Sequence, residues 1–159
     1  MKKIEDIEIE QAALKFQQKI IDRSQLQPSV CGCKDCQKMC HTAPCLGTPF
    51  DMFAIQQIPE YQPKVAIVMN MVAPKLGLPP LLMLAPSFDK AKGHCSFYEN
   101  GKCTLHEKGL KPLEGKMANC TPDAALIKAT RLIMESWLPF QFQLAPVFFK
   151  KQTELITTD

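Results

Sequence analysis

The sequence predicts an α+β domain that is mainly helical, with long loops, one short hairpin and an arrangement organised by bound metal. Three observations favour this fold class. Apolar residues recur at helical spacing near both ends of the chain, many of the 13 prolines interrupt its middle, and the 8 cysteines gather in two groups. The 159 residues fit a single domain, residues 1–159, because a chain of this size removes about 68–70% of its unfolded surface from water.

We divide this domain into three parts. An N-terminal helix is expected in residues 1–28, a metal-chelating cysteine-cluster region in residues 31–120, and a C-terminal helix and tail in residues 121–159. The first helix is predicted over residues 4–23 and ends before Pro28. Its apolar stripe, which no Gly or Pro interrupts, consists of Ile4, Ile7, Leu14, Ile20 and Ile21.

A second helix is predicted to begin after Gly47. Thr48 suits the N-cap and Pro49 the first helical position, while Asp51 places a negative charge in the first turn, where the helix dipole favours it. We expect this helix to end at Pro59, because proline cannot continue the helical hydrogen bonding.

The middle of the chain offers room for short elements only. Prolines are dense in residues 61–92, so we expect a short strand at residues 65–69 between extended loops. Residues 96–98 and 102–105 flank an acidic-Asn-Gly sequence, which predicts a hairpin.

Helical structure is predicted again after the hairpin. Residues 112–119 suit one or two helical turns, and a longer helix starts at Thr121 and ends at Pro139. The residues expected on its core face are Ala125, Leu126, Ala129, Leu132, Ile133 and Trp137. Phenylalanine and leucine then alternate with glutamine from Phe140 onward, which predicts an edge strand or extended tail. We interpret the aromatic stretch of residues 140–149 as core, with a surface for a protein partner as the alternative.

Composition and charge exclude several classes of protein. With 46% hydrophobic and 22% charged residues the chain is neither disordered nor fibrous. The net charge of +3 is spread without long basic runs, so we expect no nucleic-acid partner. Prolines break the most apolar segment, residues 65–85, and acidic residues follow the N-terminus, so we expect no membrane span and no secretory signal. A cytoplasmic protein is therefore expected, and in that compartment clustered cysteines are more often metal ligands or catalytic groups than disulfides.

The cysteines form two groups separated by 49 residues. Five of them lie within 15 residues, at spacings that let several sulfur atoms bend toward one soft metal ion. Free cysteines are often small buried hydrophobic residues, but so dense a group with Gly and Lys between its members argues against that role here. The predicted metal ligands are Cys31, Cys33, Cys36, Cys40, Cys45, Cys95, Cys103, Cys120 and His106.

The turn of the predicted hairpin decides which of these ligands share a face. A two-residue turn places Cys95 opposite His106, whereas a three-residue loop places Cys95 and Cys103 on one face. We predict the three-residue loop, because two thiolates of one metal site must point the same way. His106 follows Cys103 by three residues, a reasonable ligand spacing. His41 and His94 are each adjacent to a cysteine, and neighbouring side chains usually point apart.

A series of motifs in residues 31–120 carries a resemblance to a known family. The series consists of the multi-cysteine segment, Gly47-Thr48-Pro49 opening a helix, the hairpin from Cys95 to Cys103 with its acidic-Asn-Gly tip, and Lys111-Pro112 before a last cysteine. In this order the sequence resembles the YkgJ-type cysteine-cluster family, a zinc- or iron-chelating domain. The resemblance implies metal chelation by the cysteines in a small bacterial or archaeal intracellular protein. A similar cluster accompanies flagellin lysine methylases, which hints at an enzymatic use.

The chain departs from the family pattern at two places. Three residues separate Cys36 from Cys40, where the family commonly has adjacent cysteines. Gly115 stands where family members often have a cysteine, three residues after the proline, and the last cysteine comes instead at Cys120. In one regular helix that offset would turn the side chain by about 140° to another face. Cys120 is therefore the least supported of the predicted cysteine ligands.

Two functions fit these observations. The first is a metal-binding protein that chelates zinc or iron in closed coordination, with a structural, sensing or metal-handling role. The second is an iron–sulfur redox protein or oxidoreductase, with a [4Fe-4S] cluster as one form of the cofactor, because thiolate-rich sites suit both. A cluster with an open position beside a cleft would favour the second. The sequence contains no Gly-rich phosphate loop or nucleophile elbow, and it predicts no catalytic residue.

Overall fold

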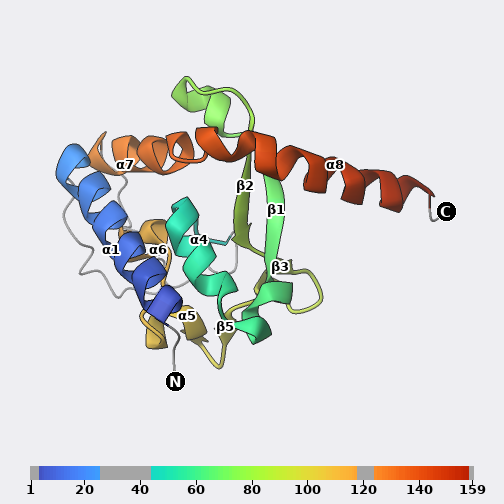
Figure 1. Ribbon diagram of the computed structural model, residues 1–159, viewed down its shortest axis with the longest axis horizontal. Coiled ribbons are helices and arrows are strands. Elements are labelled where there is room, and N and C mark those ends of the chain that lie inside the picture. Colours follow the sequence, from blue (N-terminus) through green and yellow to red (C-terminus); the bar gives the residue numbers. More distant parts are fainter. Residues whose placement is uncertain (1–3, 26–43, 118–123, 158–159) are drawn as a thin grey trace.

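The computed structural model describes residues 4–25, 44–117 and 124–157. Its fold is α+β and mainly helical, as the sequence predicts (Figure 1). The α-helices are α1 (Ile4–Ser24), α4 (Pro49–Gln56), α5 (Thr104–Glu107), α6 (Leu113–Met117), α7 (Ala124–Glu135) and α8 (Gln141–Thr157). The strands are β1 (Val65–Asn70), β2 (Leu81–Pro86), β3 (Phe88–Asp89), β4 (His94–Cys95), β5 (Tyr98–Glu99) and β6 (Lys102–Cys103). Within the described residues, 3₁₀ helices cover Pro59–Lys64, Ala73–Leu76 and Leu138–Phe140.

Helix α1 confirms the first predicted helix, and α7 confirms the core face predicted for the later one. The buried face of α1, which includes Ala13 and Ile20, packs against α4 and α7. The predicted core residues Ala129, Leu132, Ile133 and Trp137 are buried, and Ala125 and Leu126 pack partly buried against the same core. The predicted N-cap of α7, Thr121, lies outside the described residues.

Helix α4 begins as predicted, and its first turn joins three parts of the fold. Thr48 and Asp51 form a capping box, in which the Asp51 backbone N–H donates to the Thr48 hydroxyl and the Thr48 backbone N–H donates to the Asp51 carboxylate. The same carboxylate accepts hydrogen bonds from the Gln17 side chain of α1 (2.7 Å) and from the Leu113 backbone of α6 (3.2 Å). Burial raises the pKa of Asp51 from its ordinary value, an effect that the hydrogen bonds from Thr48, Gln17 and Leu113 partly oppose. Because this carboxylate links α1, α4 and α6, it also fixes the chain that leads into α4.

Strand β1 confirms the predicted strand and pairs with a second strand that was not predicted. Strands β1 and β2 are antiparallel, with Val65 opposite Pro86 and Asn70 opposite Leu81. The prolines that argued against a strand stand at the two ends of β2, where a missing N–H is tolerated. Every residue of β2 is buried. The Gln141 side chain exchanges two hydrogen bonds with the Leu82 backbone (2.8 and 2.9 Å), so an amide covers the edge that β2 would otherwise expose.

The prediction of an edge strand or extended tail from Phe140 onward is wrong. A 3₁₀ turn leads directly into α8, which passes through Pro146 and continues to Thr157. The alternation of apolar residues and glutamine over five positions also fits a helix, because Leu144 and Phe148 are four residues apart and both pack on the body. In Figure 1, α8 follows α7 along the top of the molecule and projects past β1 toward the C-terminus.

The interpretation of the aromatic stretch as core is confirmed for half of its phenylalanines. Phe140 and Phe148 pack against the core, whereas Phe142 and Phe149 are 93% and 58% exposed. A partner-binding role for the exposed pair stays a prediction. Among the described helices, none is both long and apolar enough to cross a membrane.

Candidate metal centre

The structure describes three of the eight cysteines that the sequence predicts as metal ligands. These are Cys45, before α4, and Cys95 and Cys103, in the segment of short strands; His106 is described as well. The predicted ligands that lie outside the described residues are Cys31, Cys33, Cys36, Cys40 and Cys120. The less favoured His41 lies outside them too.

Cys45 is half-buried and faces the start of α6. Next to it, the Leu46 backbone N–H donates to the Glu114 carboxylate, and the Glu114 backbone N–H donates to the Leu46 carbonyl, both at 3.1 Å. This reciprocal pair holds the cysteine segment against α6. A Cβ placed on Gly115 would lie 3.0 Å from the Cys45 sulfur. The glycine at position 115 therefore leaves room for the Cys45 thiol. In the family that the sequence resembles, this position often carries a further cysteine.

Cys95 is 5% exposed and lies on β4. Its cross-strand partner is Phe88 of β3. Directly opposed residues of an antiparallel pair share a face, so Cys95 lies on the same face as Phe88. The neighbouring pair is also linked, since the Ser87 hydroxyl donates to the Ser96 hydroxyl at 3.1 Å.

The predicted three-residue hairpin loop is wrong. Tyr98 pairs with Cys103 and Glu99 with Lys102, which leaves Asn100 and Gly101 as a two-residue turn. Both turn residues have positive φ, 52° and 76°. An Asn-Gly pair favours this turn because its twist matches that of the strands.

This register sets Cys103 opposite Tyr98 rather than on a shared face with Cys95. The Tyr98 ring packs edge-on against the ring of His94, with 5.1 Å between the centroids. Cys95 belongs to the β3–β4 pair and Cys103 to the β5–β6 pair, so the single hairpin register expected to set both on one face is not formed. His94 is half-buried, and its Nδ1 lies 2.8 Å from the Cys95 carbonyl oxygen. His106 lies exposed on α5, one turn after Cys103.

A cavity of 710 Å³ connects the surroundings of Cys45 and Cys95. One wall contains Pro44 and Leu46, which precede and follow Cys45, and another contains Phe88, the cross-strand partner of Cys95. Strands β1 and β2 and helix α7 complete the lining, which is mostly apolar. Sequence neighbours of Cys45 and the strand partner of Cys95 thus line one cavity, although neither of these two cysteines is itself among the described lining residues.

Glu114 is the acidic residue of this cavity, and sequence reasoning missed it. Burial raises the pKa of its carboxyl group above the ordinary value, and the hydrogen bond from the Leu46 backbone partly opposes that rise. Nothing in the local sequence singles out this glutamate. Its position depends on the packing of α6 against the segment before α4, which only the tertiary structure shows.

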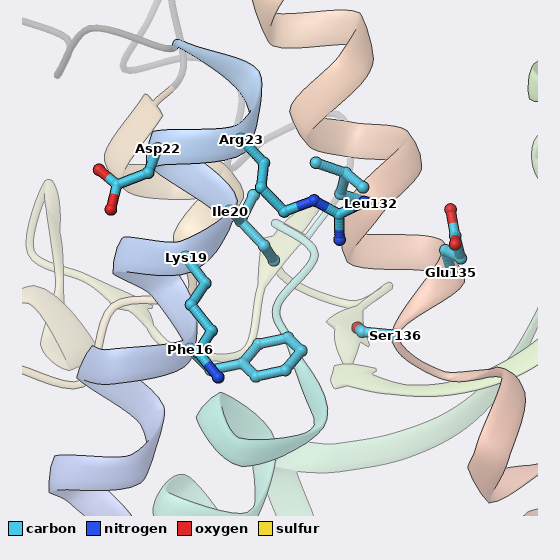
Figure 2. A pocket seen from close by; sticks show the side chains of 8 residues that line it. All are labelled: Phe16, Lys19, Ile20, Asp22, Arg23, Leu132, Glu135 and Ser136. Atoms are coloured by element: carbon cyan, nitrogen blue, oxygen red, sulfur yellow. The ribbon is translucent and has the colours of Figure 1, made fainter.

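A second cavity, of 340 Å³, lies between α1 and α7 (Figure 2). Figure 2 shows Arg23 reaching from α1 toward Leu132 of α7, while Asp22 points away from it. Glu135 at the rim pairs with Arg131 at 3.6 Å. None of the cysteines that the structure describes lines this cavity, whose mixed charges are typical of a seam between two packed helices.

In the parts of the chain that the structure describes, no three Cys, His, Asp or Glu side chains are grouped so that they could hold a metal ion. The donor set of the predicted site is nevertheless rich in sulfur, which suits zinc, iron or an iron–sulfur cluster. Comparisons with protein-family models, with curated proteins and with solved structures found no match to this chain.

Proposed function

We propose that this chain is a cytoplasmic metal-binding protein that chelates zinc or iron through clustered cysteine thiolates. The observation that carries the proposal is that the two neighbours of Cys45 and Phe88, the strand partner of Cys95, line one cavity, although 49 residues separate the two cysteines in sequence.

The wall beside α6 supports the proposal further. The half-buried Cys45 sulfur faces a position that carries no side chain, and the chain that follows Cys45 is anchored by the backbone hydrogen bonds of Leu46 and Thr48. A thiolate held on an anchored segment loses little conformational freedom when it binds a metal. The proposed ligands are the eight cysteines and His106, with Cys120 the least supported cysteine.

The cavity also supports the second candidate, an iron–sulfur redox protein or oxidoreductase. A cluster bound beside an apolar cavity of this size would have room for a substrate or an electron-transfer partner on its open side. When bound, such a cluster supplies one-electron redox chemistry. A closed zinc or iron site makes no use of the cavity.

Elemental and acid-labile sulfide analysis of anaerobically purified protein tests the proposal. Zinc or iron is expected in the wild-type protein, together with a large loss of that metal in Cys45→Ser and in Cys95→Ser. Ser96→Ala serves as the control, because it alters the neighbour of Cys95 without removing a sulfur. Metal content that is unchanged in both cysteine variants would contradict the proposal. Visible absorption together with acid-labile sulfide would indicate an iron–sulfur protein. Colourless protein that contains zinc would indicate the closed metal site.

A further inference from the structure

The 710 Å³ cavity has the size and lining of a small-molecule site. Several large apolar side chains that remain exposed in the described structure lie along it: Met69, Met71, Val72 and Phe88. Methionine side chains adapt to ligands of irregular shape, because they are unbranched and polarizable. The concentration of these exposed residues at one cavity indicates an apolar ligand body.

Glu114 gives the cavity a specific polar group. One carboxylate oxygen accepts the hydrogen bond from the Leu46 backbone at 3.1 Å. The other oxygen takes part in no hydrogen bond within the described residues. Among the described residues, every fully enclosed side-chain oxygen has a hydrogen-bond partner. Because the second oxygen of Glu114 has none, it is not fully enclosed and is accessible. A ligand in the cavity therefore meets a carboxylate acceptor on a wall that is otherwise mainly apolar, with Asn70, Ser87 and Thr130 as its neutral polar residues among those described.

The charges around Glu114 leave it without a cationic partner in the described structure. Lys90 lines the cavity but lies exposed on the turn between β3 and β4, and Lys111 lies beside Gly115. Neither lysine forms an ion pair with Glu114. A carboxylate in apolar surroundings is costly to leave unpaired, so a cation that brings its own apolar body is the complementary ligand.

We infer that this cavity binds small apolar amines, with the ammonium group on the open oxygen of Glu114 and the apolar body against β1, β2 and the methionine side chains. An anionic ligand would need Lys90, whose exposed ammonium group stays hydrated and contributes little. The inference does not depend on the proposed metal, since neither the carboxylate nor the apolar walls belong to the predicted ligand set.

Three probes that share one body and differ in their head group test this inference on the full-length protein with its metal as isolated. The probes are 4-phenylbutylamine, 4-phenylbutanol and 4-phenylbutyrate, and calorimetry gives their affinities. The amine is expected to bind about 10- to 100-fold more tightly than the alcohol, as a charge-assisted hydrogen bond in an apolar site implies. The butyrate is expected to bind most weakly. Equal binding of amine and alcohol, or a preference for the butyrate, would overturn the inference without any variant.

Two variants locate the site, and a third is the control. Glu114→Gln keeps an acceptor for the Leu46 backbone and is expected to abolish the preference for the amine. Ala66→Phe fills the cavity from β1 and is expected to weaken all three probes. Glu107→Gln removes an exposed carboxylate of α5 and leaves binding unchanged. An amine preference that survives Glu114→Gln would refute the assignment. Unaltered metal content in that variant separates this result from any failure of the proposed metal site.

Discussion

Replacing Asp51 by alanine tests how the fold positions the cysteine segment. The carboxylate is 3% exposed and accepts hydrogen bonds from Thr48, Gln17 and Leu113 at 3.0, 2.7 and 3.2 Å. Each buried donor left without an acceptor costs about 1–3 kcal/mol. Removal of the charge relieves part of its desolvation, so we expect a net loss of about 4 kcal/mol in the free energy of unfolding.

For a chain of this size, about 4 kcal/mol corresponds to a fall of about 8–16 °C in Tm. Differential scanning calorimetry measures the change, with Asp22→Ala as the control. Asp22 accepts a hydrogen bond from Gln18 on the exposed face of α1, so its removal is expected to change stability by less than about 0.5 kcal/mol. Metal content is also expected to fall in Asp51→Ala, because α4 and α6 hold the Cys45 segment. A Tm equal to that of the control variant would refute the role assigned to Asp51.

Three further predictions concern the proposed ligand Cys36, the glycine beside Cys45, and the protonation of Asp51. Cys36→Ser is expected to release metal and lower Tm, since a structural site couples metal binding to folding; elemental analysis that shows unchanged metal argues against Cys36 as a ligand. Gly115→Ala places a Cβ 3.0 Å from the Cys45 sulfur and 2.9 Å from Lys111 Cε. We therefore expect the free energy of unfolding, measured by urea denaturation, to fall by about 1–3 kcal/mol. Stability equal to that of the wild type would show that Cys45 and Lys111 can move to accommodate the methyl group. Burial raises the pKa of Asp51 above 3.8, so the folded state binds this proton more tightly than the unfolded state. The free energy of unfolding of the wild-type protein, relative to that of Asp51→Asn, should therefore fall as pH rises from about 3.8 through the raised pKa. Denaturation of both proteins at each pH measures this difference. A rise in the difference over that interval would contradict the burial argument.

The sequence predicted correctly those helices that are marked by capping residues in one turn or by apolar residues along one face. Thr48, Pro49 and Asp51 mark the start of α4, and the apolar stripe marks α1, because capping and helical periodicity act within a few residues. Strand β2 was missed because prolines argue against a strand, although Pro79 and Pro80 precede it and Pro86 is its last residue. Helix α8 was mistaken for an extended tail because five alternating residues fit either period.

The sequence proposes ligands for the candidate site but does not fix their arrangement. Cysteine spacing predicted metal ligands in two segments but left open how these ligands group into sites; the structure places neighbours of Cys45 and the strand partner of Cys95 on one cavity. The predicted hairpin register failed because the positive φ preference of Asn100 and Gly101 set the turn. Glu114 and the cavity itself depend on packing between segments about 70 residues apart, which no local pattern encodes.

X-ray absorption at the metal edge tests the central claim most directly, because it reports the atoms bound to the metal in the protein as purified. Thiolate chelation predicts a first shell dominated by sulfur at about 2.3 Å from zinc, or the corresponding sulfur shell of iron. That shell is expected to lose sulfur in Cys45→Ser and in Cys95→Ser. A first shell of oxygen or nitrogen at about 2.0–2.2 Å, or folded protein that binds neither zinc nor iron, would contradict the account.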